Sequence, residues 1–269
     1  MAGSLVSIAV GFVILALVFG AIERLFPARR QPIVRPGWWT DLAYWVFTPL
    51  VTRAVTRVAV IAALLPVLLL AGQNLDPERI AKGFGPLSRQ PLWLQAIEMI
   101  VLGDFIGYWT HRWFHGGWRW RFHAIHHSST HLDWLAAVRL HPVNDVIGKL
   151  AIALPMIGLG FSPVATAGVV PFLTFYAILL HANVDWRFGP LSKVIASPAF
   201  HRWHHTSAAA GRDRNFAGLL PLWDILFGTF WLPDRPPTVF GVDDPVPAHL
   251  PGQLLWPFRR DHGRFTIAR

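Results

Sequence analysis

The sequence predicts an all-α protein, a polytopic membrane helical bundle of four or five spans with a cytoplasmic helical cap. Three observations support this fold class. Hydrophobic residues make up 53% of the 269 positions and charged residues only 14%, whereas an ordinary soluble domain carries about 25% charged residues. Long stretches without charge follow one another along the chain, and the histidine clusters all fall where the chain returns to one side of the bilayer.

The composition also excludes several classes of site. The chain contains no cysteine, which rules out disulfides, cysteine-ligated iron–sulfur clusters, thiolate haem and cysteine nucleophiles. Glutamate occurs only at Glu23, Glu78 and Glu98, too few for a ferritin-like di-iron site. The net charge of +9 comes from basic residues that flank apolar spans. It therefore favours contact with anionic lipid headgroups over nucleic acid.

The first 90 residues are expected to form an N-terminal transmembrane anchor region. Residues 2–22 carry no charge and have the length of about 20 residues that a bilayer helix needs. No basic stretch precedes them, so we expect an uncleaved anchor. The basic loop at 23–40 is expected in the cytoplasm. Residues 58–75 are the next expected span, with the stretch before them at the interface and 76–91 as a loop on the far side.

A histidine-box region is expected over 91–231 and a cytoplasmic C-terminal tail over 232–269. A third span is expected at about 91–110. It contains Glu98 and Asp104, and charges inside a span usually face a bundle interior or a site. The uncharged residues 150–180 are expected to form a hairpin, divided at 158–163, that brings the chain back to the cytoplasm near His181.

Eight histidines fall into three tight groups, within the motifs HRWFH, HAIHH and HRWHH. They are His111, His115, His123, His126, His127, His201, His204 and His205. Spacings of three and four residues place imidazoles on one helix face, where they converge. Imidazole suits iron, zinc and copper, and eight such ligands exceed what one tetrahedral zinc ion uses. The pattern predicts that the cap holds a histidine-rich dimetal site.

Other readings of the histidines fit less well. Haem held by two imidazoles in a membrane takes lone histidines from different spans instead of pairs at span ends. A zinc hydrolase needs three ligands and a general base such as glutamate, and no H-E-x-x-H motif is present. The isolated His249 and His262 are interpreted as polar side chains at the headgroup level.

The three motifs and their order resemble the fatty acid hydroxylase/sterol desaturase superfamily, with its His-x3-His box and two His-x2-His-His boxes. The likeness extends to DFIGYWTHRWFH at 104–115, RLHPVND at 139–145 and NFAGLLPLWDILFGTF at 215–230. It covers roughly residues 98–231, half of the chain, and points to a bacterial-type member. The first 90 residues match only as generic spans.

The resemblance implies a non-haem centre with two iron ions, O2 as co-substrate and zinc as a substitute metal. Carried over by position, its ligands are the eight box histidines with His181 and His141, although His141, beside a proline, can instead support a ligand. Relatives often carry a further histidine where this chain has Ala177.

Residues near the histidines are expected to orient the imidazoles. A metal-bound imidazole needs its other ring nitrogen held by a polar group. Asp104, which lies seven residues before His111 on the same helix face, is expected to do this, as are Asn183 and Asp185. Asp133, Asn144 and Asp145 lie near the other histidine groups and are further candidates, whereas Asp224 is expected to hold the cap onto the cluster.

The function that the resemblance implies is O2-dependent attack on an unactivated C–H bond of a membrane lipid. Hydroxylation needs one hydrogen abstraction and desaturation needs two, so we favour a hydroxylase and keep a desaturase as the alternative. The His-Pro-Gly-Gly motif of a fused haem domain is absent, so electrons are expected from a separate ferredoxin or small cytochrome with its reductase. We expect the bacterial inner membrane, an active site facing the cytoplasm and no nucleic-acid partner.

One alternative function and the identity of the substrate stay open at this point. A catalytically silent lipid- or metal-binding membrane protein would be expected to have lost a box histidine, and all eight are present. The substrate is also open, among sterol-like lipids, acyl chains, ornithine- or sphingolipids, ether lipids and carotenoids.

Overall fold

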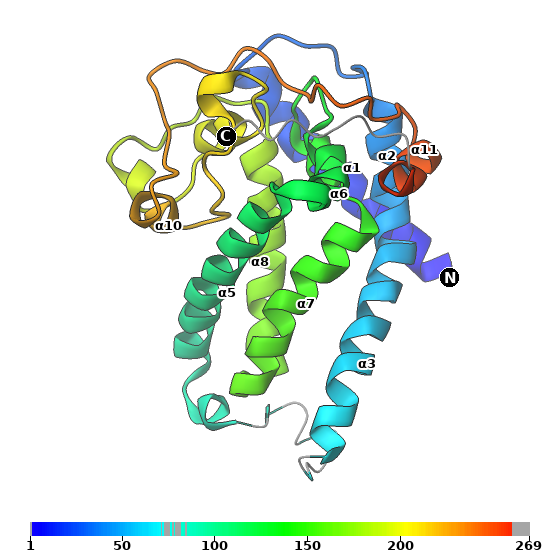
Figure 1. The fold of residues 1–269 in the computed structure, drawn as a ribbon, viewed down its shortest axis with the longest axis vertical. Helices are drawn as coiled ribbons and strands as arrows, with labels where there is room; N and C mark the ends of the chain where they lie inside the picture. Colours follow the sequence, from blue (N-terminus) through cyan, green and yellow to red (C-terminus); the bar gives the residue numbers. More distant parts are fainter. Residues whose placement is uncertain are drawn as a thin grey trace.

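The computed structural model describes residues 2–259 apart from positions 71, 73–75, 77, 79–81 and 84. Over these residues the secondary structure consists of helices and turns, with two isolated β-bridges and no β-strand. Long helices run side by side and make up most of the height of the molecule, while short helices and loops gather at one end (Figure 1). The predicted fold class, a helical bundle with a helical cap, is confirmed.

Four stretches are long and apolar enough to cross a membrane among the described residues: Leu5–Leu25, Trp38–Leu70, Pro142–Leu159 and Pro163–His181. The first belongs to α1 (Ala2–Leu25). The second runs without a break through α2 (Trp38–Phe47), the π-turn η1 (Thr48–Thr52) and α3 (Arg53–Leu70). These stretches make the chain an integral membrane protein.

The second of these stretches differs from its sequence-based prediction. A span over 58–75 preceded by an interfacial segment was expected, but one helical rod begins at Trp38 and ends at Leu70. Arg53 and Arg57 interrupt the hydropathy, yet both side chains are exposed. A long arginine side chain can lie along an apolar surface with its charge in a polar layer, so these charges do not end the helix.

The expected hairpin is confirmed as α7 (Pro142–Leu159) and α8 (Pro163–His181). Gly160 sits between them with φ +87°, and a Cβ there would lie 2.1 Å from the backbone nitrogen of Gly85. Only glycine permits both this left-handed conformation and so close an approach. Ser162 then caps α8 by accepting from the amide of Ala165 at 3.1 Å.

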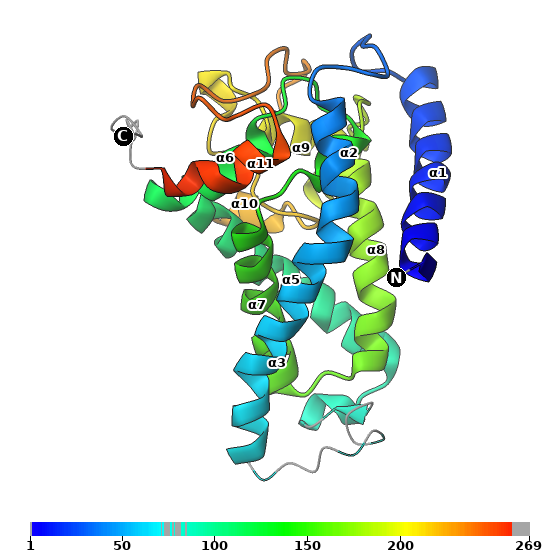
Figure 2. The same cartoon turned by 90° about the vertical axis from the view of Figure 1, so that its right-hand side faces the viewer.

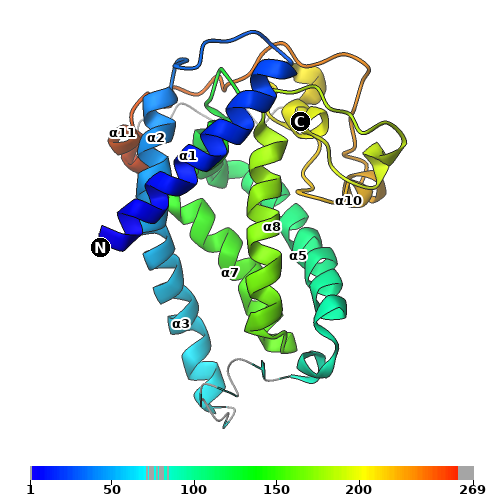
Figure 3. The same cartoon turned by 180° about the vertical axis from the view of Figure 1, so that it is seen from behind.

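α5 (Leu92–Phe114) corresponds to the expected third span at 91–110, but it is not among the four stretches apolar enough to cross a membrane by composition. It nevertheless packs against α7 and α8 within the bundle (Figures 1 and 3). Its polar residues are used inside the protein. Gln95, for example, donates to the carbonyl of Gln90 at 2.9 Å and accepts from the amide of Ser162 at 2.9 Å.

The cap consists of short helices at the end where α5 and α8 finish (Figure 2). The α-helices there are α6 (Trp120–His127), α9 (Pro198–His204), α10 (Leu222–Leu226) and α11 (Leu250–Leu255). Short 3₁₀ turns accompany them: η3 (Gly117–Arg119), η4 (Trp134–Val138), η5 (Gly189–Lys193), η6 (Ala209–Gly211) and η7 (Trp256–Phe258), with η2 (Pro86–Arg89) at the opposite end.

The N-terminal helices share a core with the cap. α1 crosses α2 (Figure 3), and Phe19 packs in one buried cluster with Trp134 and Leu135 of η4 and Ile178 of α8. The loop at 26–37, between α1 and α2, therefore lies at the same end of the bundle as the cap (Figures 1 and 2).

Candidate metal centre

Helix ends bring the box histidines together. His111 lies in the last turn of α5 and His115 caps its C-terminus; His181 is the last residue of α8. The second box lies on α6, and the third lies on α9 and its C-cap His205. α9 starts sharply because Pro198 occupies its first turn and Ser197 accepts from the amide of Phe200 at 3.2 Å. These four helices converge at the cap, so histidines far apart in sequence become neighbours.

Nine histidines form two groups, and within each group ring nitrogens lie within 4.8 Å of one another. The first group contains His111, His115, His123, His127 and His204. The second group contains His126, His181, His201 and His205. The two groups adjoin, since the rings of His127 and His205 stack with centroids 4.4 Å apart.

Each His-x2-His-His box is divided between the two groups. On α6, the pair His123 and His127 belongs to the first group, whereas the intervening His126 belongs to the second. The third box is divided in the opposite way: His201 and His205 belong to the second group, whereas His204 belongs to the first. Residues four apart share a helix face more closely than residues three apart, so one short helix can supply two adjoining sites.

The inward-facing nitrogens are arranged as metal ligands are. The Nε2 atoms of His111 and His123 lie 3.0 Å apart, and those of His126 and His181 lie 3.1 Å apart. Nitrogens each about 2.1 Å from one ion lie about 3.0–3.4 Å apart at ordinary coordination angles. The Nε2 atoms of His115 and His204 are buried without any hydrogen-bond partner. Buried polar atoms are normally paired, so these two nitrogens are available as metal ligands.

The outward-facing nitrogens of the first group are held by oxygen acceptors. The Nδ1 of His111 donates to the carbonyl of Phe216 at 2.8 Å, and that of His204 to the carbonyl of Arg214 at 2.7 Å. Each Nδ1–H therefore leaves a lone pair on Nε2, as metal binding requires.

Side chains complete this support. The Nδ1 of His123 bonds to Oδ1 of Asn144 at 2.7 Å, and the Nδ1 of His115 bonds to Oδ1 of Asp213 at 3.0 Å. Asn144 had been a candidate from the sequence. Asp213 had not, although it is a carboxylate in the loop just after the third box.

The second group is supported through backbone carbonyls. The Nδ1 of His126 donates to the carbonyl of Arg139 at 3.0 Å, and the Nδ1 of His181 to the carbonyl of Ala177 at 2.7 Å. A backbone carbonyl is present at every position, so no sequence signal could have identified these two partners.

Burial keeps the cap imidazoles neutral. It lowers the pKa of His123, His127 and His204 well below the ordinary value of 6.5, and neighbouring imidazoles lower it further. Burial lowers the pKa of His205 in the same way. The bond to His115 in turn lowers the pKa of Asp213, which stays a carboxylate. The centre therefore offers neutral nitrogen ligands at ordinary pH, the form that binds metal.

His141 is not part of either group. Its Nδ1 accepts from the amide of Val143 at 3.1 Å and caps α7, while its Nε2 bonds to the carbonyl of Leu254 at 3.2 Å. Both ring nitrogens are used by the backbone, so the structure places His141 as a helix cap.

The three residues expected to orient the histidines contact other groups. Asp104 accepts from the amides of Gly218, Leu219 and Leu220 at 3.1, 2.8 and 2.8 Å. Among the contacts of the described residues, neither it nor Asn183 nor Asp185 bonds to a histidine: Asn183 binds the backbone of Arg29, and Asp185 pairs with Arg187.

Asp104 nevertheless acts on the centre through the loop after α9. Asp224 accepts from the amides of Phe216 and Ala217 at 2.8 and 2.9 Å, as its expected role in holding the cap requires. Together with Asp104 it fixes residues 216–220, which present the Phe216 carbonyl to His111. The carboxylates of Asp104 and Asp224 thus support His111 indirectly, through the backbone of the loop that they hold.

Comparison with known proteins agrees with this site. The model of the fatty acid hydroxylase family matches residues 96–229, which contain all nine histidines of the two groups. The ornithine lipid hydroxylase OlsE of Rhizobium tropici is 35% identical over 182 residues, 66% of this chain and 55% of that protein. The alkylglycerol monooxygenase of Danio rerio is 31% identical over 150 residues, 55% of this chain and 33% of that protein.

A more distant relative is the very-long-chain aldehyde decarbonylase GL1-6 of Oryza sativa subsp. indica, 30% identical over 139 residues, 47% of this chain and 21% of that protein. The matches thus span from about half to a fifth of the length of these relatives. No solved structure shows significant similarity to the chain. With its three histidine boxes converging on one centre inside the matched region, the chain belongs to the fatty acid hydroxylase family.

Proposed function

We propose that the protein is an O2-dependent di-iron oxidase that hydroxylates an unactivated C–H bond of a membrane lipid. One observation carries the proposal: nine buried or half-buried histidines form two adjoining groups with their Nε2 atoms facing inward. Bare lone pairs of neutral imidazoles repel one another at 3.0 Å, so the arrangement needs a cation in each group.

The residues that would hold the two irons are the five histidines of the first group and the four of the second. Iron bound by these imidazoles supplies the redox chemistry that activates O2. The protein holds the imidazoles neutral by burial and aims them with Phe216, Asn144, Asp213 and Arg139. Zinc is a substitute metal that such ligands also accept, but it has no redox chemistry.

Aromatic rings surround part of the centre. The aromatic rings of Phe216 and Trp120 lie 4.9 and 5.1 Å from the ring of His115, and Phe114 stacks near His123. A dry, apolar surround favours an oxidation directed at a hydrocarbon and limits side reactions with water.

The centre is proposed to face the cytoplasm of a bacterial inner membrane. The loop between α1 and α2 lies at the cap end and carries Arg29, Arg30 and Arg35. Basic loops are retained on the cytoplasmic side of bacterial membranes. On that side, a ferredoxin or small cytochrome with its reductase can deliver the electrons.

Ornithine lipid is the substrate class we propose first, because the relative with 35% identity is named as an ornithine lipid hydroxylase. Bacterial cells that make ornithine lipid would express the parent chain, His204→Ala or His249→Ala. His204 belongs to the first histidine group, while His249 is exposed and lies outside both. Total lipids would be compared by mass spectrometry after growth under O2 carrying a heavy isotope.

The expected result is one heavy oxygen atom in ornithine lipid with the parent and His249→Ala, and none with His204→Ala. A labelled ether lipid would keep the hydroxylase and change the substrate. Loss of two hydrogens without label would make the enzyme a desaturase. Identical lipids from all three strains, with iron present and electron donors supplied, would contradict an oxidase and indicate a silent lipid- or metal-binding protein.

A further inference from the structure

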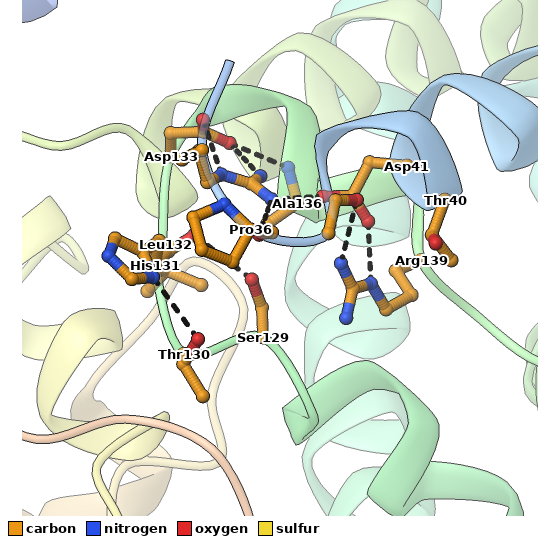
Figure 4. A network of polar contacts seen from close by, with 12 residues as sticks. Pro36, Thr40, Asp41, Ser129, Thr130, His131, Leu132, Asp133, Ala136 and Arg139 are labelled. Atoms are coloured by element: carbon orange, nitrogen blue, oxygen red, sulfur yellow. Dashed lines mark hydrogen bonds and ion pairs between the residues drawn. The ribbon is translucent and has the colours of Figure 1, made fainter. Parts of the chain in front are cut away.

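A buried network of charges joins the loop between α1 and α2 to the histidine-box region. Arg35 binds Asp133 through two parallel bonds, Nε to Oδ2 at 2.8 Å and Nη2 to Oδ1. Its Nη1 lies 2.7 Å from Oδ2 of Asp41. The Nε of Arg139 donates to the other oxygen of Asp41 (Figure 4). All four residues are buried, the most exposed at 6%, and their charges balance.

The network holds both ends of η4. Asp133 caps its start by accepting from the amide of Ala136 at 3.0 Å, and Arg139 follows its last residue. The carbonyl of this same Arg139 accepts from Nδ1 of His126 at 3.0 Å. The side chain of Arg139 is thus fixed by Asp41, while its backbone aims a histidine of the second group.

Gly37 shows independently that the position of Arg139 is tightly defined. Its carbonyl accepts from Nη2 of Arg139 at 3.2 Å, and a Cβ at this position would lie 2.5 Å from that nitrogen. Gly37 also has φ +82°. The loop from the N-terminal region is therefore shaped around the guanidinium group.

Glu23, near the end of α1, makes a second link from the N-terminal region to segments that neighbour the second group. Its Oε1 accepts from the amides of Trp134 at 2.9 Å and Asn183 at 2.8 Å. Trp134 begins η4, and Asn183 lies two residues after His181. Two segments are thus tied to the N-terminal region. One is η4, which is followed by the Arg139 that supports His126, and the other is the segment that follows His181.

In the first group, no ring nitrogen is held through this network among the contacts of the described residues. Arg139 does reach the helix that carries His123 and His127, since its Nη1 donates to Ser128, the C-cap of α6, at 3.1 Å. The supports of the first group are Asn144, Asp213, Arg214 and Phe216, all inside the family match at 96–229. Glu23, Arg35 and Asp41 lie outside that match. We propose that Glu23, Arg35 and Asp41 are positioning residues for the second histidine group, with Asp41 acting on His126 through Arg139. This inference rests on the proposed two-metal centre.

The experiment compares metal sites, not turnover, in full-length protein purified in detergent. Ferrous iron is added without O2 and followed by Mössbauer spectroscopy, with His115→Ala and His201→Ala identifying the signals of the first and second groups. The test variants are Asp41→Asn and the double variant Asp41→Leu/Arg139→Met. The double variant removes a balanced pair and leaves Arg35 with Asp133, so it avoids an uncompensated buried charge. Asp243→Asn, in an exposed pair with Arg212, is the control.

Both test variants are expected to weaken iron binding by about 10–100-fold at the site whose signal His201→Ala removes. The signal that His115→Ala removes, and both signals of Asp243→Asn, should stay at parental intensity. If Asp41→Asn does not fold, the double variant decides. Parental intensity of both signals in the double variant would overturn the inference, as would equal loss of both. A parent chain that binds no iron would instead contradict the proposed function.

Discussion

The Nε2 atoms of His111 and His123 lie 3.0 Å apart although the Nδ1 atom of each ring already has an oxygen acceptor. An imidazole that donates from Nδ1 is a lone-pair acceptor at Nε2 when neutral. Two acceptors cannot form a hydrogen bond with each other, but both can bind the same cation. The protein thus holds its ligands in the metal-binding geometry through contacts made on the outside of the rings.

Removal of metal is expected to lower thermal stability. Without a cation, inward-facing lone pairs repel and the two groups lose their common bond partner, while metal that binds only the folded chain stabilises it by mass action. The melting temperature of the detergent-solubilised protein should fall on treatment with a chelator and recover on addition of ferrous iron. An unchanged melting temperature, together with proof of metal loss by elemental analysis, would contradict this.

His126 and His127 are adjacent but are expected to serve different metal ions. His127→Ala should remove the same Mössbauer signal as His115→Ala, and His126→Ala the same signal as His201→Ala, because the second box is divided between the groups. Each variant is expected to retain about one iron where the parent binds two. Loss of one common signal from both variants would show that α6 faces a single site.

Asp213 is expected to strengthen metal binding at the first group. Asp213→Asn keeps an acceptor for Nδ1 of His115 but removes the charge, and iron affinity should fall by about 10–100-fold. The matched control is Asp243→Asn, since Asp243 is exposed and pairs only with Arg212 among the contacts of the described residues. Equilibrium competition with a chelator measures the iron affinity of both variants. Equal iron affinities would show that the charge of Asp213 does not support metal binding.

Asp104 is expected to stabilise the loop that supports His111. In Asp104→Asn one oxygen becomes an NH2 group that faces an amide donor, because both carboxylate oxygens accept from the 218–220 backbone. The free energy of unfolding should fall by about 1–3 kcal/mol. Thermal unfolding checks this, and hydrogen exchange should show the loss of protection over residues 216–220. Unchanged exchange in that loop would contradict the assigned role.

Gly160 is expected to be essential to the α7–α8 hairpin. Gly160→Ala combines a left-handed φ of +87° with a Cβ 2.1 Å from the backbone of Gly85, and the melting temperature should fall markedly. Gly168→Ala, in α8 with open space around its Cβ position, is the control and should melt close to the parent. Equal melting of the two variants would show that the turn tolerates a side chain.

The elements that the sequence predicted well are those set by local composition. The hairpin division at 158–163 follows from Gly and Pro between uncharged runs, and it is realised at Gly160–Ser162. The expected span at 58–75 lies within a longer helical stretch as far as Leu70, and its positions 71 and 73–75 lie outside the described residues. The start of the helix was predicted too late because hydropathy responds to Arg53 and Arg57, whereas a helix continues wherever its backbone bonds are satisfied. The spacing of the histidines predicted their convergence, yet it could not show that each box is divided.

By itself, the sequence determined that this is an integral membrane protein of helices and that histidine supplies its candidate metal ligands. Both follow from which side chains are present and how they are spaced. Only the tertiary structure decided that His204 joins His111 while His201 joins His181. It also decided that the backbone carbonyls of Arg139, Arg214 and Phe216 orient His126, His204 and His111, respectively. Every residue carries a backbone carbonyl, so its role depends on where the packing of distant helices places it.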